Sequence, residues 1–120
     1  ARVTCVEGLN ARTLSNIGEP FDLIVADVSF ISLTKVLPQW PALLAKSGHV
    51  LSLVKPQFEV GRKALGKSGI VREENVARLA AEDIATWLEN EQGWRVVGLI
   101  PSPIAGGSGN REFLLGAKNG

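Results

Sequence analysis

Two charged residues follow the two best-marked apolar runs of the chain. Asp27 comes directly after Leu23–Ala26, and Lys55 comes directly after Val50–Val54. A continuous apolar run of about 4–8 residues between turn signals is typical of a strand buried on both faces. Open α/β folds bind their ligands beyond the carboxyl ends of such strands. If the two strands run parallel, Asp27 and Lys55 lie at one edge of the sheet; the alternative is an ordinary capping Asp and a solvated Lys.

A third charged residue, Glu112, opens the last apolar segment, Glu112–Ala117. No helical pattern separates this segment from Trp94–Ile100, so the two are predicted to pair as antiparallel strands. An antiparallel strand begins beside the ends of its parallel neighbours. If the last strand inserts next to Val50–Val54, its Glu112 reaches the same edge as the first two charged residues.

A lysine between two carboxylates could orient and deprotonate a hydroxyl for attack on an electrophile. Such general-base assistance is worth about 10²–10⁴-fold in rate. Nearby carboxylates favour the protonated amine, so Lys55 would need desolvation or a further cation to act as a base. The alternative is a salt-bridge network that only stabilises the sheet edge, and the sequence leaves both interpretations open.

A second pattern, Gly61–Ser68, matches the phosphate-loop pattern GxxxxGK[ST]. The pattern requires a strand that runs directly into its first glycine and a helix that starts at its lysine. Here Pro56–Val60 precede the glycine, and Gly69–Val71 follow the serine before any helical pattern. Nucleotide binding through this loop is therefore an alternative of lower rank. The loop at 101–110, PSPIAGGSGN, is either a lid over the edge or a simple connection.

The connector between the two marked strands is predicted to be helical. Ser32 can cap it, and Pro38 and Pro41 favour a broken, two-part helix. Lys46–Gly48 is expected to end it, with Gly48 in a left-handed conformation. Val3–Val6 is a further strand candidate at the start of the chain.

The clearest helix runs from about Glu74 to Gln92. Apolar residues at helical spacing form one stripe that we expect to face the core: Val76, Leu79, Ala80, Ile84, Trp87 and Leu88. The whole pattern predicts an α/β fold in a single domain over residues 1–120, with parallel strands and one antiparallel strand at the end.

Composition sets the remaining limits. With 120 residues, 45% hydrophobic and 21% charged, the chain is typical of one globular domain. Cys5 and His49 are the only cysteine and histidine, so no disulfide framework or metal site is predicted, and a cytoplasmic setting is expected. No apolar stretch approaches the roughly 18 residues of a membrane span. A basic loop is a candidate phosphate contact, with a solvated loop as the alternative: Arg62, Lys63, Lys67 and Arg72.

Several phrases together resemble one family over nearly the whole chain. They are NAR (10–12), DVSFISL (27–33), LVKPQFEVG (53–61), GKSGIVRE (66–73) and SPIAGGSGNREFLL (102–115). They resemble the TlyA/haemolysin-A-like family of FtsJ-type RNA methyltransferases. Members of that family methylate ribose 2′-hydroxyls of ribosomal RNA with S-adenosyl-L-methionine and carry a Lys-Asp-Lys-Glu tetrad. The resemblance assigns the last three tetrad positions to Asp27, Lys55 and Glu112.

The resemblance also implies binding positions. Cofactor contacts are expected at Asn10, Asp27 and Val28, and contacts to ribosomal RNA or ribosomal subunits at the basic loop and at Arg111. The first tetrad lysine, the glycine-rich turn and the N-terminal RNA-binding module of the family would lie upstream. This chain is then the C-terminal part of a Rossmann-like methyltransferase domain that lacks the first two strands and half of the cofactor pocket.

By this resemblance Val3–Val6 is a strand without its native neighbour. We expect the segment to be displaced, to pair with another chain in a homo-oligomer through the unpaired sheet edge, or to fill the space beside Leu23–Ala26. Two other functions are alternatives. A non-catalytic RNA-binding or assembly module would need the basic loop but not the tetrad. A membrane-active haemolysin is disfavoured, because the helix at 74–92 has acidic rather than basic polar residues.

Overall fold

The structure is a computed structural model that describes every residue except 1, 14–17, 62–70, 72, 105–109 and 120. The described strands form a 4-stranded sheet in the order β1-β2-β4-β3. β1 pairs parallel with β2, and β4 pairs antiparallel with β2 and β3. The predicted α/β class and the insertion of the last strand beside the second marked strand are confirmed. The strands span Phe21–Ala26 (β1), Leu44–Val54 (β2), Arg95–Pro101 (β3) and Phe113–Lys118 (β4).

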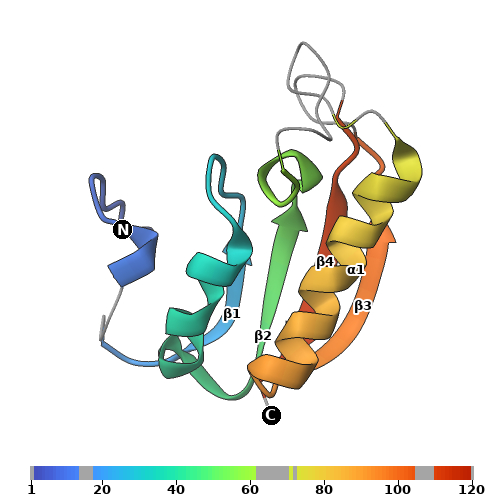
Figure 1. The fold of residues 1–120 in the computed structure, drawn as a ribbon. Helices are drawn as coiled ribbons and strands as arrows, with labels where there is room; N and C mark the ends of the chain where they lie inside the picture. Colours follow the sequence, from blue (N-terminus) through green and yellow to red (C-terminus); the bar gives the residue numbers. More distant parts are fainter. Residues whose placement is uncertain (1, 14–17, 62–70, 72, 105–109, 120) are drawn as a thin grey trace.

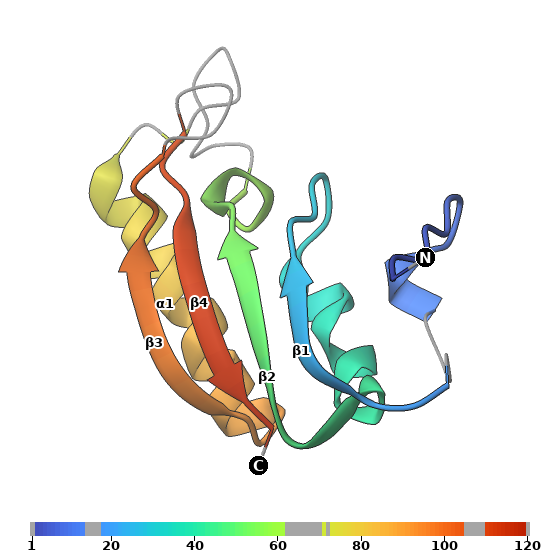
Figure 2. The ribbon, with the colours of Figure 1, turned by 180° about the vertical axis from the view of Figure 1, so that it is seen from behind.

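The described helices that pack on the sheet all lie on one of its faces. α1 (Glu74–Glu91) crosses the β2-β4-β3 part, and the 3-10 helices η2 (Leu33–Lys35) and η3 (Leu37–Leu43) lie on the same side near β1 (Figure 1). Figure 2 shows the opposite face, which no described helix covers. Of the other short helices, η4 (Pro56–Phe58) follows β2, and η1 (Ala11–Thr13) belongs to the N-terminal segment.

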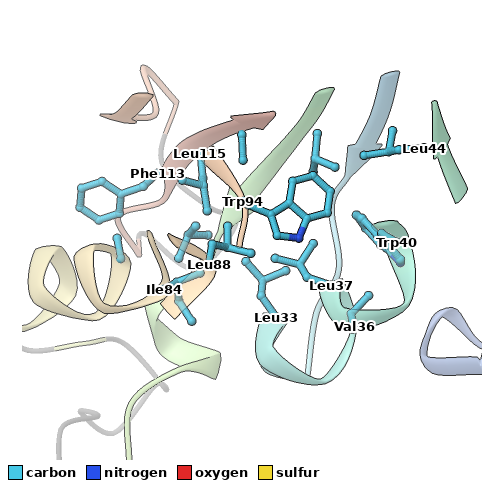
Figure 3. Close-up of a cluster of buried hydrophobic side chains, with 14 of the residues drawn as sticks. Leu33, Val36, Leu37, Trp40, Leu44, Ile84, Leu88, Trp94, Phe113 and Leu115 are labelled. Carbon is cyan, nitrogen blue, oxygen red and sulfur yellow. The ribbon is translucent and has the colours of Figure 1, made fainter. Parts of the chain in front are cut away.

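The core fills the space between the sheet and its helices. In β4, Phe113, Leu115 and Ala117 are buried and alternate with partly exposed residues, as expected for a strand with one covered face. The indole of Trp94 lies at the centre of the cluster, close to Leu37 of the connector (Figure 3). The core thus joins the connector, α1 and the two central strands.

The expectation that the first two marked strands are buried on both faces is wrong for the described chain. Leu23 and Val25 of β1 are 56% and 67% exposed, and Leu51 of β2 is 42% exposed. Each of them alternates along its strand with residues that pack on the core, so they lie on the opposite face, which Figure 2 shows without helices. Ile100 of β3, 57% exposed, alternates in the same way with Leu99. We call this apolar surface the open face.

The connector differs in detail from the prediction. It consists of the two 3-10 helices η2 and η3, so the predicted break is confirmed, and the Ser32 hydroxyl caps η2 by accepting a hydrogen bond from Thr34 N at 3.2 Å. The expected left-handed terminus at Gly48 is wrong, because β2 already begins at Leu44 and Ser47 holds the positive φ of 70°. A Cβ at Gly48 would lie 2.9 Å from a backbone oxygen of Ala45, so close backbone approach explains this glycine.

The helix prediction is confirmed in extent, and three residues of the predicted stripe are buried as expected: Ala80, Ile84 and Leu88. The rest of the buried face is corrected. Ala77 and Ala81 are buried toward the core, whereas Leu79 is 57% exposed. Small residues let the helix axis come close to the sheet, so the alanines occupy the buried face. The larger Leu79 and Trp87 instead line a groove along one side of α1.

The N-terminal strand prediction is wrong. Residues 2–10 form no strand, and Val3 and Val6 are 82% and 64% exposed. Of the three expected outcomes, the structure has the displaced one: the segment lies beyond β1 without joining the sheet (Figure 1). β1 is therefore an edge strand of the described sheet, and its outer backbone groups have no strand partner there.

Candidate active site

The carboxyl ends of the two parallel strands bring Asp27 and Lys55 into contact. The Nζ of Lys55 lies 2.5 Å from Oδ1 of Asp27 and donates a hydrogen bond to Oγ of Ser29 at 2.8 Å. The Lys55 side chain is 13% exposed and that of Asp27 is 66% exposed. The amine is thus held from one side and mostly withdrawn from water, while the carboxylate faces the surface.

Glu112 lies at the same edge. It precedes Phe113, which pairs with Val54, so it is level with the start of the Lys55 segment. Its backbone oxygen accepts a hydrogen bond from Ser102 N at 2.8 Å, but among the described residues no ion pair joins its carboxylate to Lys55. The structure therefore gathers the three predicted residues at one edge and joins two of them directly.

Sequence reasoning missed Ser29 as a partner of Lys55. Ser29 stands two residues after Asp27, and side chains two apart on an extended segment point to the same side. That spacing could have indicated that both polar groups face the amine. We call residues 27–33 the Asp27 loop and residues 55–59 the Lys55 turn.

The Asp27 loop contains a strained residue. Phe30 has a φ of 63°, a left-handed conformation that is uncommon for a bulky side chain. Its ring packs against Phe58 of the Lys55 turn with 5.0 Å between ring centroids, although Phe30 is 89% exposed. Backbone strain of this kind often occurs at functional sites.

Glu59 closes the Lys55 turn and was also missed. Its Oε1 accepts a hydrogen bond from Oγ of Ser32 at 2.5 Å, and its Oε2 accepts one from Leu33 N at 2.9 Å. Burial raises the pKa of this carboxyl above its ordinary value, even though both hydrogen bonds act to lower it. The sequence offered no charge partner for Glu59, because its partners are a hydroxyl and a backbone amide.

A hollow of about 280 Å³ lies along β1 next to the Lys55–Asp27 pair. Asp27 and Val28 line it together with Ala11, so two of the predicted cofactor positions face it and the third, Asn10, adjoins a lining residue. The Asn10 side chain accepts a hydrogen bond from Arg12 N at 2.9 Å. Most of the remaining lining is apolar: Phe21, Ile24, Val25, Ala26, Trp40 and Leu43.

The predicted RNA-contact residues are only partly described. Arg62, Lys63, Lys67 and Arg72 lie outside the described residues, as does most of the phosphate-loop pattern. Arg111 pairs with Glu74 at the start of α1, with 3.3 Å between Nε and Oε1. The side-chain amide oxygen of Asn110 accepts a hydrogen bond from Val71 N at 2.9 Å, which ties the ends of the two long loops together.

The phosphate-loop alternative fails one of its structural conditions. β2 ends at Val54, and η4 stands between this strand and Gly61, so no strand runs into the first glycine. In the part of the chain that the structure describes, no cluster of three or more His, Cys, Asp and Glu could hold a metal ion. None of the described helices combines the length and apolar character needed to cross a membrane.

The chain is similar in sequence to known proteins. TlyA of Mycobacterium tuberculosis, a 16S/23S rRNA (cytidine-2′-O)-methyltransferase, is 41% identical over 116 residues, which cover 95% of this chain and 43% of TlyA. YqxC of Bacillus subtilis is 47% identical over 89 residues, or 74% of this chain and 31% of YqxC. The chain thus spans less than half the length of these relatives.

A solved structure and a family model also match the chain. The crystal structure of a hemolysin-like protein from Lactococcus lactis superposes with a TM-score of 0.84 at 39% identity, covering 93% of this chain and 54% of that one. The model of the FtsJ-like methyltransferase family matches residues 1–119. With its parallel β1–β2 pair, its antiparallel last strand and this match, the chain belongs to the FtsJ-like methyltransferase family.

Proposed function

We propose that the full-length protein transfers a methyl group from S-adenosyl-L-methionine to a ribose 2′-hydroxyl of ribosomal RNA, free or within a ribosomal subunit. The observation that carries this proposal is the contact of Lys55 with Asp27 and Ser29 at the carboxyl edge. Family membership and the activity of the related TlyA support the reaction type. Residues 1–120 then form the C-terminal part of the catalytic domain, and the protein acts in the cytoplasm.

The hollow beside β1 suits part of the cofactor. S-adenosyl-L-methionine, which the family uses, supplies a methyl group on a positively charged sulfur. Apolar walls favour a flat ring, and the Asp27 carboxylate can accept hydrogen bonds from a polar group of the ligand. At about 280 Å³ the hollow is smaller than the roughly 300–1,000 Å³ of typical ligand sites. We infer that Asn10, Asp27 and Val28 hold one side of the cofactor and that upstream residues complete the pocket.

Lys55 is the proposed base. Its Nζ would accept the proton of the 2′-hydroxyl, which makes that oxygen a stronger nucleophile. Asp27 and Ser29 orient the amine, and Glu112 orients the hydroxyl or its surroundings.

The basic residues provide the proposed RNA contact. Arg111 lies next to Glu112, so a phosphate bound there is close to the reacting edge. Its pair with Glu74 is exposed on both sides, 59% and 65%, and such pairs contribute little stability, which leaves the guanidinium available for a phosphate. The other proposed phosphate contacts are Arg62, Lys63, Lys67 and Arg72.

Substitution of Lys55 by alanine tests the proposal. In the full-length protein, Lys55→Ala should abolish transfer of radiolabelled methyl groups to ribosomal RNA while circular dichroism shows an unchanged fold. The matched control is Lys46→Ala, which removes an exposed lysine at the other end of β2. Retained activity in Lys55→Ala would rule out its role as the base.

A second experiment, which measures both RNA binding and methyl transfer, separates the proposal from a non-catalytic RNA-binding module. Such a module would bind ribosomal RNA through its basic residues without a methyl-transfer site. Charge reversal by Asp27→Lys would then leave the RNA affinity unchanged, and the wild-type protein would transfer no methyl groups. Loss of methyl transfer with intact RNA binding in that variant supports the enzyme.

A further inference from the structure

The Asp27 loop contacts the Lys55 turn at three places. At the near end, Lys55 contacts Asp27 and Ser29. In the middle, the rings of Phe30 and Phe58 pack together. The sequence order of the contacts is the same on both segments, so the two run side by side from the reacting edge toward η2.

The far end of this pairing is held by Glu59 alone among the described carboxylates. Its two oxygens accept hydrogen bonds from the Ser32 hydroxyl and from the backbone N–H of Leu33. Leu33 is 2% exposed and belongs to the core, so this end of the loop is fixed to the folded body of the protein. Ser32 also caps η2, so the same contact sets where the loop stops and the connector begins.

The loop does not hold its conformation through local preferences. Phe30 adopts a left-handed backbone, which is unfavourable for a non-glycine residue and persists only when neighbouring contacts enforce it. The Phe30–Phe58 contact is exposed, and Asp27 is largely in water. Val28 and Ile31 pack against the core from the same loop, but apolar packing sets no hydrogen-bond geometry. The half-buried hydrogen bonds of Glu59 are therefore the polar contacts that fix the far end of the loop.

We propose that Glu59 is a positioning residue for Lys55. By fixing Ser32 and Leu33, its carboxylate holds the Asp27 loop so that Asp27 and Ser29 meet the amine of Lys55. The catalytic consequence rests on the proposed function, because a misplaced amine matters only if Lys55 takes a proton from the substrate. The geometric statement, that Glu59 controls the surroundings of the amine, is independent of it.

Chemical labelling of the amine tests the geometric statement. In the full-length protein, the rate of reductive methylation of Lys55 by formaldehyde, followed by mass spectrometry, should rise several-fold in Glu59→Ala. The matched control is Asp83→Ala. Asp83 and Glu59 both line the groove along α1, but Asp83 has no described contact with the Asp27 loop. A wild-type labelling rate in folded Glu59→Ala would overturn the proposal.

Kinetics test the catalytic consequence. With the loop released, kcat for methyl transfer should fall about 10- to 100-fold, as small misplacements of a catalytic group do, while KM for the RNA changes little. Glu59→Gln should recover most of both readouts, because its amide oxygen can accept from Leu33 N and its amide nitrogen can donate to Ser32. A Gln variant as impaired as the Ala variant would show that these hydrogen bonds are not the cause.

Two further outcomes are distinguishable. If Glu59→Ala does not fold, Ser32→Ala removes one of the two donors and should give a smaller rise in Lys55 labelling; a wild-type rate there would overturn the proposal. If the wild-type protein transfers no methyl groups, the proposed function fails. The labelling result then still decides whether Glu59 positions the amine.

Discussion

The two parts of the sheet differ in how firmly they are packed. β2, β4 and α1 share one core in which Val54, Leu115 and Ala81 are at most 2% exposed. β1 has no buried residue, and its Leu23 and Val25 are more than half exposed. The Lys55–Asp27 pair lies on the border between these parts, because Lys55 follows β2 and Asp27 follows β1. The proposed base therefore belongs to the well-packed part of the molecule, which comprises β2, β4, β3 and α1. Its partners Asp27 and Ser29 belong to the exposed part, which comprises β1 and the Asp27 loop.

This difference shows that stability and site geometry have separate origins. The β2-β4-β3 part with α1 is held by buried apolar surface, which is the dominant stabilising term in folding. The Asp27 loop packs on this core through Val28 and Ile31, while its polar contacts to the Lys55 turn set the positions of Asp27 and Ser29. Changes in the buried core should therefore act on stability, and changes at the Lys55–Asp27 contact should act on the reaction.

The largest expected effect is on the free energy of unfolding, through a substitution in the well-packed part. Leu115→Ala removes a 2% exposed side chain from the centre of β4 and should lower the free energy of unfolding by about 2–5 kcal/mol. Val25→Ala, in β1, is the matched control and should change it by no more than about 0.5 kcal/mol, because Val25 is 67% exposed. Urea denaturation measures both. Equal losses would show that β1 is packed as firmly as β4 in solution.

The opposite pattern is expected for Asp27→Ala. Methyl transfer by the full-length protein should fall by at least about 100-fold if Asp27 orients the base. The free energy of unfolding should change by less than about 1 kcal/mol, because the carboxylate of this ion pair is 66% exposed. A large stability loss with retained activity would favour the salt-bridge network over the catalytic cluster.

The affinity for the cofactor should also depend on the difference between the two parts of the molecule. We predict that the 120-residue chain binds S-adenosyl-L-methionine far more weakly than the full-length protein does. The hollow beside β1 is small, and one side of it is formed by the exposed part of the molecule. Isothermal titration calorimetry on both proteins compares the affinities. Micromolar binding by the 120-residue chain would show that its own residues complete the pocket.

The sequence predicted those features that depend on pattern and topology. Apolar runs ended by Asp27 and Lys55 located the edge, and the absence of a helix before the last strand placed Glu112 at it. The strand register completes the arrangement. Val54 pairs with Phe113, so Lys55, which follows Val54, lies at the same edge as Glu112, which precedes Phe113. The site was predictable to this extent because backbone pairing alone determines it.

Features that depend on tertiary surroundings were not predictable. Val3–Val6 has the composition of a strand, but a strand needs a neighbour, and the structure gives it none. Gly48 suggested a helix end by type, whereas the nearby oxygen of Ala45 explains it. Glu59 gave no signal because its partners, a hydroxyl and an amide, are found only by folding the two segments together.

The smallest expected effect is on the pH dependence of stability, through Glu59. Because burial raises the pKa of Glu59 in the folded state, the folded protein binds this proton more tightly than the unfolded chain does. The resulting contribution to stability is present below the ordinary pKa of 4.5 and is lost as the pH rises through the raised value. The stability of the wild type relative to Glu59→Gln should therefore fall as the pH rises from about 4 to about 7.

Urea denaturation across this range measures the difference, with Asp83→Asn as the matched control. Asp83 lines the same groove from α1, so the control removes a neighbouring charge without touching Ser32 or Leu33. A difference of the opposite sign would mean that the hydrogen bonds from Ser32 and Leu33 outweigh burial in setting the pKa of Glu59. In that case the far end of the Asp27 loop is anchored more strongly as the pH rises. The exposed part of the molecule is then held more tightly next to η2 than the exposure of β1 suggests.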